Sequence, residues 1–187
     1  MRASLITLML SFACSASAQV LLHSETESEL KDSVVPPEGV VNLILRDEPS
    51  DASYFGECMA EGSRTAREFF TSSLLDLNHD GSPDYFVRPA LRPYCGAFYG
   101  AHLFRYWLVT SHRKGGRISY RIVFKSGGDE ATVLSHSTNG YRDLVLVGHN
   151  ALESYTSTWH FNGSKYEPGS CTKRVFQQSG PSKLSEC

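Results

Sequence analysis

One stretch of nine residues carries most of the chemistry that the sequence offers, and it reads Asp76-Leu77-Asn78-His79-Asp80-Gly81-Ser82-Pro83-Asp84. Carboxylate or carboxamide oxygens stand at positions 1, 3, 5 and 9 of this stretch, with glycine at position 6. Alternate side chains of a tight turn converge on one point, and Ca²⁺ prefers oxygen ligands. Gly81 gives the backbone freedom to reverse around an ion. The spacing predicts a Ca²⁺ site with ligands from Asp76, Asn78, Asp80 and Asp84 and the backbone carbonyl of Ser82. A polar turn that binds nothing is the alternative.

The surroundings of this loop differ from those of an EF-hand. Position 12 should be a bidentate glutamate, and here it is Val87. The flanking runs 74–75 and 85–87 are typical of buried strands rather than helices. The D-x-N-x-D-G-x-x-D pattern between strands resembles the calcium-loop hairpins of integrin-type FG-GAP repeats and of related bacterial secreted or periplasmic proteins. That resemblance, confined to the loop and its flanks, implies that the acidic residue at position 9 closes the metal site.

Residues 1–18 predict a secretory signal peptide. Arg2 is its only charged side chain, residues 5–13 are its apolar core, and Ala16-Ser17-Ala18 is a small-residue cleavage site before Gln19. The apolar core is too short to span a bilayer, and no later stretch is long enough. A lipid-modified Cys14 is a poorer fit to the residues before it. We therefore expect a soluble periplasmic or secreted protein without a membrane span.

The cysteines support export. Cys14 would leave with the signal peptide, which leaves an even set of four in an oxidising compartment. Free buried thiols are the alternative, and zinc is disfavoured because the cysteines lack the close spacing of zinc ribbons. Local pairing closes loops of modest length, so we expect two disulfides, Cys58–Cys95 and Cys171–Cys187.

Composition limits the classes of partner. The 187-residue chain has 18 basic and 20 acidic side chains and a net charge of −2, so we expect neither nucleic acid nor an anionic membrane as partner. The sequence predicts an amino-terminal region over 19–66, with a strand at 40–45 and a short helix at 49–60. A β-domain over 67–170 and a polar carboxy-terminal tail over 171–187 follow.

The β-domain contains an internal repeat. A shift of 59 residues places Gly81 on Gly140 and Asp84 on Asp143. The remaining ligand positions of the loop become Ser135, Ser137 and Asn139 in the second copy. The second copy therefore predicts a turn that keeps the loop geometry without the ion, unless the similarity arose by chance.

Each half of the β-domain, 67–126 and 127–170, contains four strand-like runs and predicts an antiparallel meander like one propeller blade. Two blades cannot close a ring. We therefore predict a mainly-β fold, with two four-stranded meanders packed as a sandwich or joined in one twisted sheet. The amino-terminal segment, a mixture of coil and short helix, would cover a sheet edge. Asn162-Gly163 predicts a two-residue hairpin turn.

No set of residues predicts catalysis. The histidines lack a metal-ligand spacing on a helix, and neither a G-x-S-x-G elbow nor a phosphate-binding glycine loop is present. The connection 88–100 combines aromatic residues, arginines and Cys95, which suits either a binding surface or a disulfide-tethered cover over a sheet. We expect a binding module, such as an inhibitor or immunity-type partner of another exported protein or cell-envelope component. The alternative is an enzyme acting on cell-envelope polymer with unidentified catalytic residues.

Overall fold

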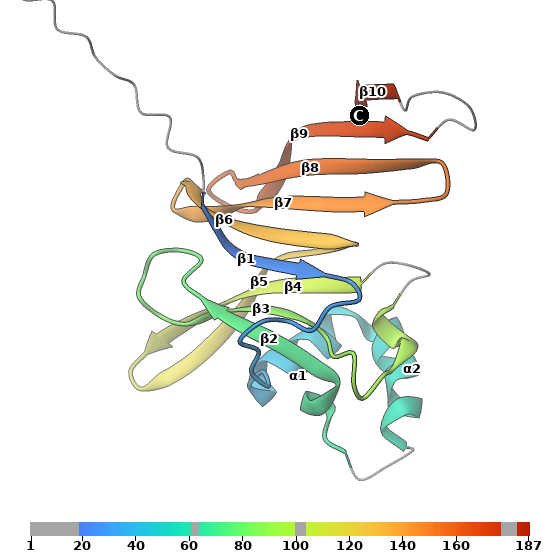
Figure 1. The fold of residues 1–187 in the computed structure, drawn as a ribbon. Helices are drawn as coiled ribbons and strands as arrows, with labels where there is room; N and C mark the ends of the chain where they lie inside the picture. The colour runs from blue at the N-terminus through green and yellow to red at the C-terminus, as the bar shows by residue number, and fades with distance from the viewer. Residues whose placement is uncertain (1–18, 61–63, 100–103, 177–182) are drawn as a thin grey trace, which may run out of the picture.

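The computed structural model describes residues 19–60, 64–99, 104–176 and 183–187. This part of the chain is mainly β, with a six-stranded and a four-stranded antiparallel sheet and two α-helices (Figure 1). The expected signal peptide, 1–18, lies outside the described residues. Among those that are described, no helix is both long and apolar enough to cross a membrane.

The elements follow one another in a simple order. Two helices, α1 (Glu38–Asp47) and α2 (Pro49–Ala60), stand between the first and second strands. The strands are β1 (Val20–Glu25), β2 (Phe70–Leu75), β3 (Asp84–Pro89), β4 (Phe104–Lys114), β5 (Arg117–Gly128), β6 (Glu130–Thr138), β7 (Tyr141–His149), β8 (Glu153–Phe161), β9 (Tyr166–Val175) and β10 (Lys183–Glu186).

The two predicted meanders are present. Strands β2-β3-β4-β5 form the four-stranded sheet, and β6-β7-β8-β9 form the middle of the six-stranded sheet. The second meander gains β1 beside β6 and β10 beside β9. The amino-terminal segment, expected as coil and short helix, is instead a strand at residues 20–25, where Leu22 and Ser24 alternate inward. Strand β9 continues to Val175, past residue 171, where the tail was expected to begin.

The sheets pack face to face around one hydrophobic core. Phe86 and Leu108 of the four-stranded sheet join Val133 and Leu144 of the six-stranded sheet in this cluster, and all four side chains are buried. A second cluster lies on the opposite face of the four-stranded sheet, where α1 and α2 cover it (Figure 1). The four-stranded sheet is thus the middle of three layers.

The predicted strand at 40–45 is a helix. Val40, Val41 and Ile44 are its buried residues, and this spacing places all three on the face that packs into the second cluster. The β-branched residues favour a strand by local propensity, but burial of one helical face outweighs that preference. The second helix, α2, spans the predicted residues and begins at Pro49, where proline's missing N–H costs nothing.

The amino-terminal segment covers the edge of β2, as expected. Val34 and Ser72 exchange two backbone hydrogen bonds of 2.7 and 2.9 Å. Arg88 of β3 is buried and donates to the Ser24 hydroxyl (3.0 Å) and to the carbonyls of Glu25 and Ser28. Burial lowers the pKa of Arg88, because removal from water disfavours the charged guanidinium. The three hydrogen bonds offset this cost and hold the amino-terminal segment against β3.

The connection between β3 and β4 is a cover rather than an open aromatic surface. A disulfide joins its Cys95 to Cys58 of α2, the pairing expected from the sequence. Phe98 is buried in the second cluster, and the Tyr99 hydroxyl donates to the Ala90 carbonyl at 2.6 Å. Tyr94, by contrast, is 67% exposed.

The second disulfide joins Cys171 of β9 to Cys187, again as expected. Two turn predictions need correction. The loop geometry expected around Asn139 is absent, because β6 continues to Thr138 and the hairpin turns on Asn139 and Gly140 alone. The turn at Asn162 is longer than predicted, since Phe161 pairs with Tyr166.

A candidate metal loop and the polar pocket beside it

The predicted metal loop joins β2 to β3, and Asp84 is the first residue of β3. The strands close with Leu75 paired to Asp84, so residues 76–83 form the loop. His79 and Gly81 have positive φ angles of 59° and 76°. Glycine adopts this backbone conformation without strain, which is the role expected of Gly81.

The polar side chains of the loop point inward and accept its backbone N–H groups. Asp76 accepts from the amides of Asp80 and Gly81, both at 3.2 Å. The Asn78 side-chain oxygen also accepts from the Asp80 amide at 3.2 Å, and Asp80 accepts from the Ser82 amide at 2.7 Å. The last contact lowers the pKa of Asp80. The side chains of Asp76, Asn78 and Asp80 thus hold the turn together through its own backbone amides.

Asp84 attaches the loop to the body of the protein. Its side chain is buried, and its two carboxylate oxygens accept from the amides of Leu77 (3.0 Å) and of Ser111 in β4 (2.8 Å). Burial, with smaller contributions from the charges of Asp80 and Asp76, raises the pKa of Asp84 from 3.8 to about 6. The sequence pattern predicts a ligand role for Asp84 but gives no sign of this structural role.

The donor set is chemically suited to Ca²⁺. Asp76, Asn78, Asp80 and Asp84 all offer oxygen, the ligand atom that this ion prefers. A carboxylate oxygen that accepts one N–H retains a lone pair for a cation. In the described ranges, no three His, Cys, Asp or Glu side chains are grouped closely enough to hold a metal ion. The ligand role of these four side chains and of the Ser82 carbonyl therefore remains a prediction.

The loop also docks on the second meander. The Arg142 amide of β7 donates to the Leu77 carbonyl at 2.9 Å, and the Leu77 side chain is buried in the core between the sheets. His79 Nε2 lies 2.8 Å from the Ser137 hydroxyl of β6. His79 therefore points toward the neighbouring sheet, and the loop is held from two sides.

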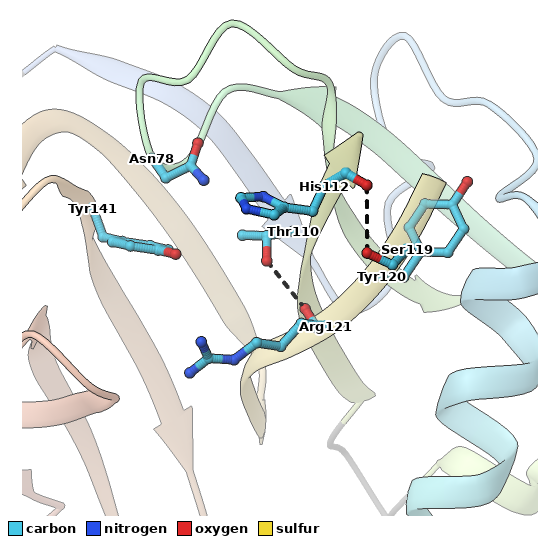
Figure 2. A pocket seen from close by; sticks show the side chains of 7 residues that line it. All are labelled: Asn78, Thr110, His112, Ser119, Tyr120, Arg121 and Tyr141. Carbon is cyan, nitrogen blue, oxygen red and sulfur yellow. Dashed lines mark hydrogen bonds between the residues drawn. The ribbon is translucent and has the colours of Figure 1, made fainter. Parts of the chain in front are cut away.

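A polar pocket of about 210 Å³ opens beside the loop (Figure 2). His112 of β4 links the two features, because its Nδ1 lies 3.9 Å from Asp80 Oδ2. Sequence reasoning missed the pocket, since its residues meet only through strand pairing and through contact between the two sheets. The lining residues are Asn78, Thr110, His112, Ser119, Tyr120, Arg121 and Tyr141.

A larger hollow of about 640 Å³ lies between β1 and β2, where Leu21 and Leu74 contribute exposed apolar surface. Asp32 is its one acidic lining residue, and the polar pocket has none. Glycoside-cleaving enzymes use two carboxyl groups that flank the bond they break. Neither hollow offers such a pair.

The histidines on the six-stranded sheet are paired singly with carboxylates rather than gathered together. His136 lies 2.5 Å from Asp143, and His160 lies 3.7 Å from Glu167. Such pairs are typical of a sheet surface. Comparisons with protein-family models, curated proteins and solved structures found no significant match to this chain.

Proposed function

We propose that the protein is an exported β-domain that binds one Ca²⁺ in the loop 76–84 and acts as a binding module for another exported molecule. The observation that carries the metal proposal is the concentration of three carboxylates and one carboxamide in a single turn. Among the described residues, the ion pair recorded for these carboxylates is with exposed His112, 3.9 Å from Asp80. One weak pair leaves most of the negative charge unbalanced.

The electrostatics of Asp84 support the same proposal. Its raised pKa reports burial together with repulsion from Asp76 and Asp80. A divalent cation held by these side chains, with Asn78 and the Ser82 carbonyl, would favour their ionised forms. The ion would supply a structural cross-link at the junction of the sheets. The residues that it fixes include Asn78, which lines the polar pocket.

Two disulfides and the polar pocket support the rest of the proposal. Disulfides persist in oxidising compartments, which suits a periplasmic or secreted location. The pocket offers donors for a ligand but no acidic pair for hydrolysis, so binding is favoured over catalysis. An inhibitor or immunity-type role toward another exported protein is the form of binding that we propose.

Stability measured with and without calcium tests the metal. An ion that binds only the folded state stabilises it by about 1.4 kcal/mol at ten times its dissociation constant. Sites in extracellular modules commonly bind Ca²⁺ at about 0.1–1 mM, so millimolar calcium should raise the urea midpoint relative to chelator. Equal midpoints in calcium and chelator would contradict the proposed site.

Two variants make this test specific. Asp80→Ala removes one charged ligand outside the strands, and we expect it to abolish the calcium-dependent part of stability. Asn139→Ala alters the matching position of the second hairpin and should retain that part. Its own cost should come from the turn, where the Asn139 amide donates to the Phe161 carbonyl at 2.8 Å. If both variants lost the calcium-dependent stability, that stability could not be assigned to a metal site in the loop 76–84.

The binding role needs its own measurement. Tagged protein is incubated with cell-envelope extract in calcium and in chelator, and captured proteins are identified by mass spectrometry. We expect a defined exported partner in calcium that Asp80→Ala retains poorly. If the same amount of partner is captured in chelator and by Asp80→Ala, a role for the loop in binding is contradicted.

A further inference from the structure

We propose that the polar pocket beside the loop binds one oxyanion group, a carboxylate or a phosphate, of a small anionic ligand. Figure 2 shows four side chains directed toward one shared space: the Asn78 amide, the His112 imidazole, the Tyr141 hydroxyl and the Arg121 guanidinium. All four groups can donate hydrogen bonds, and the Asn78 amide, which donates to Asp80 Oδ2 at 3.0 Å, has a second N–H for a ligand. The proposal rests on the binding role given above, but it does not require calcium in the loop.

Strand pairing explains why these residues share a face. In the β4–β5 hairpin, Thr110 pairs with Arg121, His112 with Ser119, and Lys114 with Arg117. Because side chains alternate along a strand, these six residues lie on one face of the hairpin. Leu108 on the same face is buried in the core between the sheets.

Exposure rises along this face toward the hairpin tip. Leu108 is 1% and Thr110 7% exposed, whereas the His112 side chain is 79% exposed. Tyr141 lies at the start of β7, so the pocket forms where the six-stranded sheet stops covering the hairpin. The pocket is therefore open to solvent on the side of the hairpin tip.

The tip of the same face carries three further cationic side chains, while Asp80 lies 3.9 Å from His112. In the part of the chain that the structure describes, no ion pair is recorded for Lys114, Arg117 or Arg121. Arg121 donates one hydrogen bond to the Ser164 carbonyl at 3.1 Å, which leaves other guanidinium donors for a ligand. The protein as a whole has a net charge of −2, so this local excess is specific to the hairpin.

The chemistry of the lining favours an oxyanion over a neutral ligand. The planar guanidinium of Arg121 matches the two oxygens of a carboxylate or phosphate, and hydrogen bonds between charged groups are the strong ones. No acidic residue lines the pocket, although Asp80 lies beside it, where Oδ2 accepts from the Asn78 amide at 3.0 Å and lies 3.9 Å from His112 Nδ1. Arg121 and Tyr141 are therefore the donors farther from this carboxylate. A cavity of about 210 Å³ suits a small molecule or one terminal group of a longer ligand.

Titration of the isotope-labelled protein followed by NMR tests the proposal. The probes are inorganic phosphate, galacturonate and, as the uncharged counterpart, galactose, at constant ionic strength. We expect saturable shifts of the Thr110, Arg121 and Tyr141 amides with phosphate, galacturonate or both, and none with galactose. Whichever anion binds more tightly identifies the source of the oxyanion. Absence of saturable shifts with both anions would overturn the proposal.

Matched variants of one hairpin separate a site from general surface charge. Arg121→Gln should weaken anion binding by about tenfold. Arg113→Gln makes the same charge change on the opposite face of β4, where Arg113 pairs with Ile118, and should keep the affinity within about twofold. Equal losses of anion affinity in the two variants would show that the binding is nonspecific electrostatic attraction and would contradict the proposed site.

A further variant guards against misfolding of Arg121→Gln. Tyr141→Phe keeps the ring, which stacks on Phe161 with centroids 4.0 Å apart, and removes only the hydroxyl. We expect a loss of affinity of about threefold, as for one hydrogen bond, and an unchanged affinity would count against the pocket. Repeating the titration in chelator separates the two proposals, because failure of the calcium site leaves the anion shifts in place.

Discussion

The β2–β3 and β6–β7 hairpins begin alike and turn differently. Leu74 pairs with Tyr85 in the first, and Val133 pairs with Leu144 in the second, so the two registers are related by the same shift of 59 residues. Beyond these pairs the first hairpin opens into the loop 76–83. The second hairpin instead passes a register shift between Val133 and Ser137, resumes its ladder up to the pair Thr138–Tyr141 and reverses on two residues.

Asp84 and Asp143, which stand at matching positions of the two hairpins, make different contacts. Asp84 is buried and holds two backbone amides, whereas the Asp143 side chain is 16% exposed and contacts the side chains of His136 (2.5 Å) and Thr138 (3.1 Å). Leu77, whose amide binds Asp84, corresponds to His136. A carboxylate that satisfies backbone amides supports an open loop, while one that satisfies neighbouring side chains accompanies a tight turn.

The largest expected effect concerns the connection that follows each of these hairpins. The connection from β3 to β4 is long and carries the Cys58–Cys95 disulfide, whereas the matching connection from β7 to β8 is short. Replacing Cys58 and Cys95 together by serine should lower the free energy of unfolding by about 4 kcal/mol, because a longer unfolded loop is released. The bridges close sequence separations of 37 and 16 residues.

The matched control replaces Cys171 and Cys187 together by serine and should cost about 3 kcal/mol. Urea unfolding under oxidising conditions measures both double variants. A larger loss from the Cys171–Cys187 bridge would reverse the expected ranking and show that loop closure does not set it.

The next effect separates the two aspartates. Asp84→Ala leaves the Leu77 and Ser111 amides without their buried acceptor and should cost about 3 kcal/mol. Asp143→Ala removes a partly exposed contact and should cost about 1 kcal/mol or less. Urea unfolding in chelator at about pH 4, where the contribution of Asp84 is complete, compares the two variants without metal. Equal costs would show that the two carboxylates do similar structural work.

The pH dependence of stability sharpens the comparison further. The folded-state pKa of Asp84, about 6, lies above its ordinary value of 3.8, so the folded protein holds this proton more tightly than the unfolded chain. The stabilising contribution is therefore complete below about pH 4 and is lost as the pH rises through 6. The loss should reach up to roughly 3 kcal/mol in chelator.

Unfolding in urea at several pH values measures this slope. Asp84→Ala should remove it, and Asp143→Ala should keep it. Calcium should weaken the slope in the unmodified protein, because the metal binds ionised carboxylates. A stability that rises between pH 4 and pH 7 in chelator would contradict the assignment to Asp84.

Local signals explain which features could be predicted from the sequence. The loop, the meanders and the disulfides depend on spacing within short stretches, and the structure contains the loop hairpin, both meanders and both bridges. Helix α1 was missed because burial of Val40 and Ile44 outweighs a β-rich local composition. The pocket was missed because Arg121 and Tyr141 meet only through the register of β4 and β5 and the packing of two sheets.

The pairing of β1 with β6 sets an order on assembly. The Gln19 amide contacts the Ser135 hydroxyl across 116 residues of sequence, and β1, which follows Gln19, pairs with β6, which contains Ser135. Contacts of such long range form late, after most of the chain entropy between them has been lost. A chain that is synthesised from its amino terminus must therefore keep β1 unpaired until β6 has been made. The six-stranded sheet can therefore be completed only after all the residues between β1 and β6 are present.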